Sequence, residues 1–225
     1  MRGLLLTLEG IEGSGKSTQA AALAESLAAG GVPVLLTREP GGVPLAETIR
    51  GLLLSPDSGP IQPLTELLLF EAARAEHVAE KIRPALESGK TVVCDRFTDA
   101  TLAYQGGGRS VPDDLLQRLN SLSTGGLTPD RTYFIDVEVS LGFERADRRS
   151  GAAGKDRIER ASAEFFEGVR RRYLELARRE AERFLLLRGN DSIADVARLI
   201  QQDAWSLIRS RALPYDGRPN PRNPK

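Results

Sequence analysis

The sequence has little of what several classes of protein need. Among 225 residues there is one cysteine, Cys94, and one histidine, His77. A single cysteine excludes an internal disulfide and favours the cytoplasm, and no cluster has the spacing of a zinc or calcium site. No apolar run approaches a membrane span. The 31 basic and 31 acidic residues cancel, so we expect no general attraction to nucleic acid or to a membrane.

What is present is the pattern of an α/β protein. Five short apolar runs, at residues 4–8, 32–37, 91–94, 132–135 and 184–187, alternate with helical segments. This alternation predicts a five-stranded parallel sheet with helices on both faces. We expect a single domain over residues 1–212 and a disordered, proline-rich tail over 213–225. Helices are predicted at 17–29, 45–54, 64–88 with a break before Pro84, 112–122, 140–149, 159–180 and 193–208, and a flexible glycine loop at 106–108.

A glycine-rich stretch after the first predicted strand is the strongest motif. Residues 10–18 match the phosphate-binding pattern G-x-x-x-x-G-K-[ST] and precede a helical segment; they are Gly10, Ile11, Glu12, Gly13, Ser14, Gly15, Lys16, Ser17 and Thr18. Glycines let successive N–H groups face one anion, and the helix adds its positive end. Lys16 is expected to reach the β- and γ-phosphates, and Ser17 to ligate Mg²⁺. The motif therefore predicts a nucleoside-triphosphate site.

Glu12 is unusual in this loop, because a carboxylate repels phosphate. We expect its side chain to point away from the triphosphate, toward a sugar hydroxyl or a Mg²⁺-bound water. The alternative is a solvated loop carboxylate.

Other polar clusters follow predicted strands and should meet at the same rim of the sheet. Arg38 and Arg96 follow the second and third strands, which suggests a second anion beside the triphosphate. Phe70 and Arg74 lie one helical turn apart and could bind a base. Each of these residues could also be a surface or core residue, and the lone His77 is expected to be packed or exposed rather than catalytic.

A basic, glycine-containing segment, residues 145–158, could close over the γ-phosphate as a lid. The glycine-rich loop has no arginine, so another segment must supply that charge. The alternative is a flexible connection.

Together these motifs resemble bacterial thymidylate kinases. The resemblance rests on residues 10–18 with Glu12, on 38–42 (REPGG), on Phe70 with Arg74, on 95–97 (DRF) followed by 103–108 (AYQGGG), and on 156–159 (DRIE). It implies a P-loop kinase fold, a homodimer, and transfer of the γ-phosphoryl group of Mg²⁺-bound ATP to dTMP. The sequence departs from relatives at Ala100, at Val139 and Ser140, and in the lid, where Ala152 and Ala153 are inserted.

The resemblance also implies roles for individual residues. Glu12 would face the 3′-hydroxyl of the acceptor, and Tyr104 would favour deoxyribose. Phe70 would stack on thymine, with Thr101 and Gln105 near the base and Arg74 on the base or phosphate. Arg38 and Arg96 would hold the acceptor phosphate, beside Pro40 of the REPGG motif. Lys16, Arg96 and the lid residues Arg145, Arg148 and Arg149 would stabilise the transferring phosphoryl group.

Three alternatives stay open. Another nucleoside monophosphate kinase would share most of these features. A deoxynucleoside kinase would need a general base, for which Asp95 is the candidate. A P-loop regulator that binds nucleotide without transfer is a different class, but its Asn-Lys-x-Asp guanine motif does not follow any predicted strand.

Overall fold

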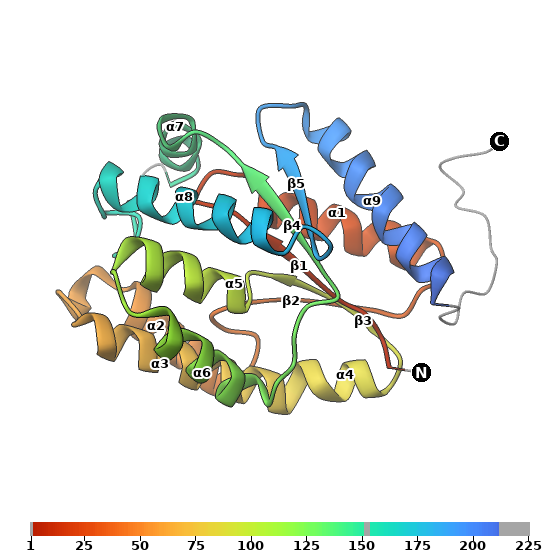
Figure 1. Ribbon diagram of the computed structural model, residues 1–225, viewed down its shortest axis with the longest axis horizontal. Helices are drawn as coiled ribbons and strands as arrows, with labels where there is room; N and C mark the ends of the chain where they lie inside the picture. The colour runs from red at the N-terminus through yellow and green to blue at the C-terminus, as the bar shows by residue number, and fades with distance from the viewer. Residues whose placement is uncertain (1, 151–153, 212–225) are drawn as a thin grey trace.

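The computed structural model describes residues 2–150 and 154–211, and for residues 149 and 150 the backbone alone (Figure 1). The predicted tail and lid residues 151–153 lie outside the described part. The single domain over residues 1–212 therefore stays a prediction.

A five-stranded parallel sheet forms the centre, with the strand order β2-β3-β1-β4-β5. Its strands are β1 (Leu5–Glu9), β2 (Val34–Arg38), β3 (Thr91–Asp95), β4 (Arg131–Asp136) and β5 (Phe184–Arg188). The register pairs Leu5 of β1 with Val92 of β3, and Leu6 with Arg131 of β4. All five predicted strands are confirmed, with ends shifted by one or two residues. Pro33 directly precedes β2, an edge strand, where a missing N–H is tolerated.

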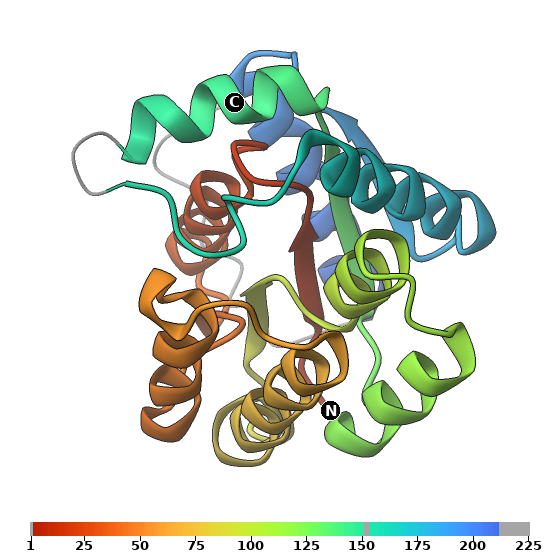
Figure 2. The same ribbon diagram turned by 90° about the vertical axis from the view of Figure 1, so that its left-hand side faces the viewer.

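Helices cover both faces of the sheet (Figure 2). The described helices are α1 (Lys16–Ala29), α2 (Pro44–Leu54), α3 (Pro63–His77), α4 (Arg83–Glu87), α5 (Thr98–Thr101), α6 (Asp113–Thr124), α7 (Val139–Ser150), α8 (Ala163–Arg179) and α9 (Ile193–Ser210), with a 3₁₀ turn η1 (Pro56–Ser58) and π-helical turns η2 (Val78–Ile82) and η3 (Leu102–Gly108). Apolar residues of α1 and α9 form one core layer with the sheet, and those of α8 and η3 form another. This arrangement is the one that the sequence pattern predicts, and it agrees with the P-loop kinase fold that the resemblance implies.

Two predictions about local structure are wrong. The predicted flexible loop at residues 106–108 is the end of the helical turn η3. Its glycines serve close packing rather than flexibility, because a Cβ on Gly107 would lie 2.5 Å from the carbonyl oxygen of Gly168 in α8.

The predicted helix break before Pro84 is also absent, since α3, η2 and α4 follow one another without a gap. A π turn shifts the hydrogen-bond pattern, and Pro84 lies in the first turn of α4, where a proline costs little. The helix predicted from residue 159 begins at Ala163, after Ser162 accepts a hydrogen bond from the N–H of Phe165.

Candidate active site

The loop between β1 and α1 has the backbone conformation of an anion-binding site. Gly13 and Gly15 have φ angles of 73° and 91°, which other residues rarely adopt. Gly15 is the N-cap of α1, and no side chain caps the helix there, so its first N–H groups face outward. The buried Ser14 hydroxyl has no hydrogen-bond partner among the described residues. This arrangement fits a phosphate group.

Lys16 is buried beside this loop and donates a hydrogen bond from Nζ to the carbonyl oxygen of Ile11 at 3.0 Å. Burial, together with the nearby positive charge of Arg96, lowers the pKa of Lys16 to about 8. A polyanionic ligand would raise this pKa again, because an opposite charge favours the protonated form.

Ser17 and Asp95 bring two oxygen ligands together at the ends of α1 and β3. The Ser17 hydroxyl donates to Oδ2 of Asp95, and Oδ1 of Asp95 is buried without a partner in the described part of the chain. Hard oxygen donors beside a triphosphate cradle suit Mg²⁺, which takes few protein ligands and completes its shell with phosphate and water. The residues therefore fit the predicted metal. No cluster of three or more acidic, cysteine or histidine side chains suited to a metal occurs among the described residues.

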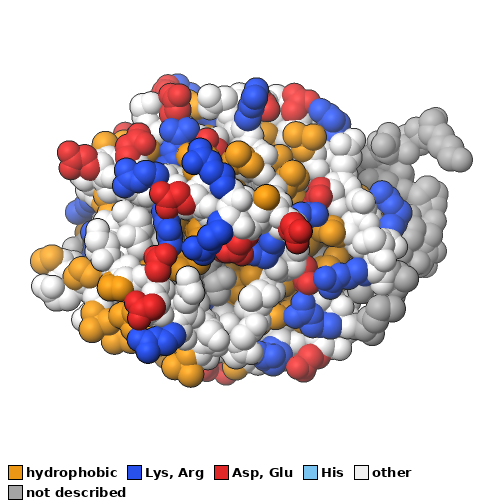
Figure 3. Space-filling view, viewed as in Figure 1, with side chains coloured by type: hydrophobic (Ala, Val, Ile, Leu, Met, Phe, Trp, Pro, Cys, Tyr) orange, Lys and Arg blue, Asp and Glu red, His pale blue; other side chains and the backbone are white. Residues whose placement is uncertain are grey.

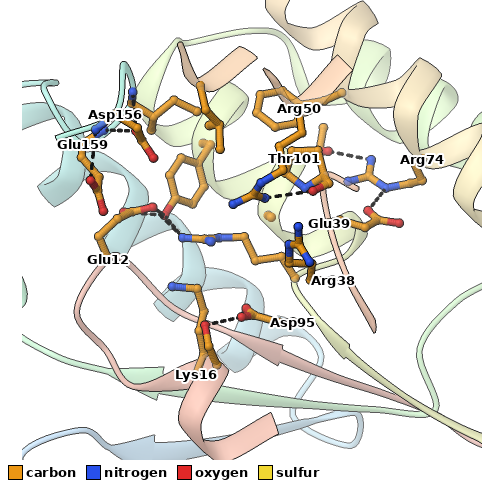
Figure 4. A pocket seen from close by; sticks show the side chains of 18 of the residues that line it. Glu12, Lys16, Arg38, Glu39, Arg50, Arg74, Asp95, Thr101, Asp156 and Glu159 are labelled. Atoms are coloured by element: carbon orange, nitrogen blue, oxygen red, sulfur yellow. Dashed lines mark hydrogen bonds and ion pairs between the residues drawn. The ribbon is translucent and has the colours of Figure 1, made fainter. Parts of the chain in front are cut away.

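A cavity of about 450 Å³ extends from this cradle along the rim of the sheet (Figure 4). Strand ends, α2, α3, η3 and residues 154–159 contribute to its wall. The residues that line it are Glu12, Lys16, Ser17, Arg38, Glu39, Pro40, Arg50, Leu54, Phe70, Arg74, Asp95, Arg96, Ala100, Thr101, Tyr104, Gln105, Gly154, Asp156, Ile158 and Glu159.

Glu12 points across the cavity to Arg96 and Tyr104. Its Oε1 accepts a hydrogen bond from Arg96 at 2.5 Å, and its Oε2 accepts one from the Tyr104 hydroxyl at 2.8 Å. Arg96 also donates to the Tyr104 hydroxyl at 3.0 Å. Its backbone has a φ of 70°, a rare left-handed conformation for arginine. The carboxylate is paired with an arginine, so it is not the solvated side chain of the alternative.

Arg74 is buried at one end of the cavity and its orientation is fixed by several acceptors. Nε donates to Glu39 at 2.7 Å, and one terminal nitrogen donates to Glu71 at 2.6 Å. The same nitrogen donates to Thr101 at 2.8 Å and to Asn120 at 2.9 Å. The other terminal nitrogen donates to the carbonyl oxygen of Phe97 at 3.2 Å.

The remaining predicted acceptor residues also line the cavity. Phe70 lies half-buried in the wall, and Pro40 follows Glu39 in the turn after β2. Gln105 is buried, and its amide lies 3.3 Å from Glu66 Oε1 as a long hydrogen bond. The structure therefore brings Glu12, Arg38, Pro40, Phe70, Arg74, Arg96, Thr101, Tyr104 and Gln105 together, along with Lys16, Ser17 and Asp95.

Arg50, in α2, is a cavity residue that the sequence analysis missed. It donates to the carbonyl oxygen of Pro40 at 2.9 Å. Burial and the positive charges of Arg38 and Arg96 lower its pKa, so three arginines repel one another there and favour an anion. Arg38, by contrast, is half-exposed and pairs with Glu47 at 3.0 Å. Arg50 carries no local signal, because it lies within a helix rather than at a strand end.

Two of the predicted lid arginines, Arg145 and Arg148, are not among the residues that line the cavity. Arg145 donates to the carbonyl oxygen of Gly189 at 2.8 Å, and Arg148 is exposed and pairs with Glu144. The side chain of Arg149 lies outside the described residues. From the same segment, Gly154, Asp156, Ile158 and Glu159 line the cavity instead. The phosphoryl-binding role of these arginines stays a prediction.

Residues 154–159, at the end of the predicted lid, are anchored by a buried carboxylate, Glu66 of α3. Arg157 donates to it at 2.6 Å and Arg109 at 3.1 Å. Burial alone would raise the pKa of Glu66, but the hydrogen bonds from these two arginines hold it below its ordinary value. Arg157 also donates to the carbonyl oxygen of Leu53 at 2.7 Å. These contacts hold residues 154–159 against the acceptor end of the cavity.

Comparisons with known proteins identify the family of this chain. A family model described as thymidylate kinase matches residues 8–200. A thymidylate kinase of Pelobacter propionicus is 48% identical over 201 residues, covering 88% of this chain and 92% of that protein. One of Pseudomonas syringae pv. syringae is 52% identical over 196 residues, covering 87% and 92%. The crystal structure of thymidylate kinase from Ehrlichia chaffeensis superposes with a TM-score of 0.73 and 34% identity, covering 91% of this chain and 99% of that one.

The match of the family model spans the glycine-rich loop, the strand-end residues and residues 154–159. Among the described residues, no helix is both long and apolar enough to cross a membrane. The chain belongs to the thymidylate kinase family and is a phosphotransferase.

Proposed function

We propose that this chain transfers the γ-phosphoryl group of Mg²⁺-bound ATP to dTMP, giving dTDP and ADP. The observation that carries the proposal is the single cavity that runs from Lys16 and Ser17 to Phe70 and Arg74. A triphosphate held at the first end and a nucleoside monophosphate held at the second would place their phosphates next to each other. Such alignment is the main requirement of phosphoryl transfer.

At the donor end, the N–H groups of residues 10–18 would cradle the ATP phosphates, and Lys16 would turn from the carbonyl oxygen of Ile11 to the β- and γ-phosphates. Ser17 and Asp95 would hold Mg²⁺ directly or through water. The ion would neutralise the charge that develops on the phosphate oxygens. This use of Asp95 leaves it unsuited to act as a general base.

At the centre of the cavity, Arg50 and Arg96 would clamp the acceptor phosphate, with Arg38 at the outer edge. A phosphate dianion is already a nucleophile, so it needs positioning and charge neutralisation rather than a strong base. Arginine suits this task because its planar donors match phosphate oxygens in pairs.

At the far end, Phe70 would stack on thymine while Arg74, Thr101 and Gln105 face the base edge. Glu12 would accept a hydrogen bond from the 3′-hydroxyl, and the Tyr104 ring beside it would disfavour a 2′-hydroxyl. Arg145, Arg148 and Arg149 would reach the transferring group only after the lid closes, since Arg145 and Arg148 have other partners in this structure.

We further propose a homodimer in the cytoplasm. Exposed leucines gather on neighbouring helices: Leu45 and Leu52 of α2, Leu64 and Leu68 of α3, and Leu122 of α6. Hydrophobic side chains are visible over this part of the surface, at the lower left (Figure 3). A patch of this kind supports association with a second copy. Light scattering during size-exclusion chromatography tests it, with a Leu52→Glu variant expected to give the monomer mass.

The substrate proposal is tested by measuring ADP release from Mg²⁺·ATP with dTMP, dUMP, dCMP, dAMP, dGMP and thymidine as separate acceptors. We expect dTMP to be strongly preferred. If thymidine were the better acceptor, the arginine clamp would be wrong and Asp95 would again be a candidate base. If no acceptor stimulated ADP release, transfer to a nucleotide would be excluded and a nucleotide-binding regulator would become the better interpretation.

A further inference from the structure

His77, the last residue of α3, does not line the cavity, yet it is wholly buried beside it. Both ring nitrogens have partners. Nδ1 lies 3.1 Å from Oε1 of Glu39, and Nε2 lies 2.7 Å from the hydroxyl of Thr37. Thr37 lies in β2 and Glu39 in the REPGG motif that follows it. A residue of α3 therefore contacts both the end of β2 and the turn after it.

Glu39 divides its carboxylate between two groups. Oε1 meets His77, and Oε2 accepts the hydrogen bond from Nε of Arg74 at 2.7 Å. Glu39 is only 5% exposed although it lines the cavity, so little water reaches its two oxygens. An oxygen that lost its partner would be a buried, unsatisfied charge, and the carboxylate would rotate to relieve it. The direction of the Nε–H group of Arg74 therefore depends on the contact at the opposite oxygen, while Glu71, Thr101, Asn120 and Phe97 hold its terminal nitrogens.

The protonation of the ring follows from this arrangement. Burial alone would raise the pKa of Glu39, but Arg74 and His77 hold it below its ordinary value, so the carboxylate is ionised and only accepts. Nδ1 must then carry the proton and donate it to Glu39. Nε2 is paired with the hydroxyl of Thr37 at 2.7 Å, as donor or acceptor.

Gly42 packs against the His77 ring. A Cβ at this position would collide with the His77 ring and would lie 2.8 Å from Oγ1 of Thr37. The φ of Gly42 is 92°, and its carbonyl oxygen accepts a hydrogen bond from Lys81 at 2.7 Å. The turn is thus packed directly on the ring, which leaves the ring no room to reorient.

We propose that His77 is a positioning residue for base recognition, acting on Arg74 through the Nδ1–H···Glu39···Nε chain. The inference rests on the proposed function, in which Arg74 faces the base of dTMP. Arg74 contacts the acceptor, and His77 sets the direction from which it does so. The contact of His77 with Thr37 is structural and has no part in base recognition.

Two substitutions separate the ring nitrogens. The amide of His77→Asn can place its NH₂ group near the position of Nδ1 and keep the donor to Glu39. The longer His77→Gln places its amide near Nε2, keeps the contact with Thr37 and loses the one with Glu39. Both variants remove the same ring, so a loss of packing alone would affect them alike.

Steady-state kinetics with dTMP and dCMP give the readout. For His77→Gln we expect kcat/KM for dTMP to fall about tenfold, through KM for dTMP, with KM for ATP unchanged. The preference for dTMP over dCMP should shrink by a similar factor. His77→Asn should restore both values to within about threefold of the wild type. Thr37→Val, which removes only the other contact, should lower stability without changing the base preference.

Equal base preference in His77→Gln and the wild type would overturn the inference, as would a His77→Asn variant that is no better than His77→Gln. Arg74→Lys, measured in parallel, separates the two proposals. If it loses base preference while His77→Gln keeps it, only the role of His77 is wrong. If Arg74→Lys keeps the preference, the proposed recognition of the base fails and the inference fails with it.

A measurement on the unaltered protein guards against variants that do not fold. Because His77 is the only histidine, nitrogen-15 labelling of histidine gives the resonances of one ring. We expect Nδ1, the nitrogen that faces Glu39, to carry a proton. A ring protonated at Nε2 alone could not donate to Glu39 and would overturn the inference.

Discussion

Glu12 and Arg96, 84 positions apart in the sequence, are joined by a hydrogen bond of 2.5 Å between Oε1 and a guanidinium nitrogen. The pair spans the point where the glycine-rich loop meets the residues after β3. It explains how a carboxylate is tolerated in a phosphate-binding loop, because the arginine offsets its charge and draws the side chain toward the acceptor end. One ion pair therefore joins the glycine-rich loop to the residues after β3 within the cavity.

The acceptor phosphate is expected to depend more on Arg50 than on Arg38. Arg50 is half-buried in the cavity wall, whereas Arg38 is half-exposed and already paired with Glu47. We expect Arg50→Ala to raise KM for dTMP by about tenfold or more, as for loss of a charged hydrogen bond, and Arg38→Ala to have a smaller effect. KM for ATP is the internal control. A larger effect of Arg38→Ala would reverse the assignment.

Binding of Mg²⁺·ATP should be accompanied by proton uptake at alkaline pH. The pKa of Lys16 is lowered to about 8, first by burial, so about half of the free protein has a neutral lysine at pH 8. The phosphates raise this pKa again, and we expect uptake of up to about half a proton at pH 8 and much less at pH 7. Calorimetry in two buffers that differ in ionisation enthalpy measures it.

Glu9 complicates that measurement and needs a control, because its pKa also lies at about 8. In Glu9→Gln the uptake due to Lys16 should remain. Loss of the uptake in this variant would assign the proton to Glu9 instead, and absence of uptake in the wild type would contradict the lowered pKa of Lys16.

Glu9 should make the fold less stable as pH rises. It is buried at the end of β1, where it accepts hydrogen bonds from Tyr173 at 2.6 Å and from the N–H of Phe97 at 2.8 Å. Burial, and then the charge of Asp99, raise its pKa from 4.5 to about 8. Between these values the folded state holds a proton that the unfolded state has lost, so the free energy of unfolding falls with rising pH, by at most about 5 kcal/mol for this group.

Glu9→Gln mimics the protonated carboxyl and should flatten this decline between pH 5 and pH 8. Denaturant unfolding at several pH values measures the slope. Glu182→Gln makes the same exchange at an exposed position and is the matched control. Equal slopes in the wild type and Glu9→Gln would show that Glu9 is ionised in the folded protein.

Gly142 should be needed for the P-loop rather than for its helix. A Cβ on this residue of α7 would lie 2.7 Å from the carbonyl oxygen of Glu12, whereas one on Gly51 of α2 would meet nothing within 4 Å. Alanine improves helix propensity at both sites by about 1 kcal/mol. We expect Gly51→Ala to be more stable with unchanged kinetics, and Gly142→Ala to raise KM for ATP several-fold. Unchanged KM for ATP in Gly142→Ala would show that the loop adapts without cost.

The sequence predicts those features that depend on local pattern. Buried parallel strands are short apolar runs, so all five strands were predictable. Polar residues that follow parallel strands are expected at one rim of the sheet. Lys16, Arg38 and Asp95 were predicted to meet there, and they line the same cavity. The glycine-rich loop was recognisable because its chemistry requires that spacing of residues.

Features that depend on distant contacts could not be predicted in this way. In the sequence, Gly107 and its glycine neighbours indicate a flexible loop. Its packing role depends on the close approach of Gly168, which is distant in the sequence. Arg50 lies inside a helix, and its cavity position follows from how α2 packs on α3. The rim position of Arg38 was predictable, but its pairing with Glu47 was not.

The most direct test of the account is to follow the terminal phosphate itself. Mg²⁺·ATP labelled in the γ-phosphate is incubated with dTMP and this protein, and the labelled products are separated. The account predicts label in dTDP, with one ADP formed for each dTDP. Label released as inorganic phosphate at the same rate with and without dTMP would contradict it, because the two ends of the cavity would then not bring donor and acceptor together.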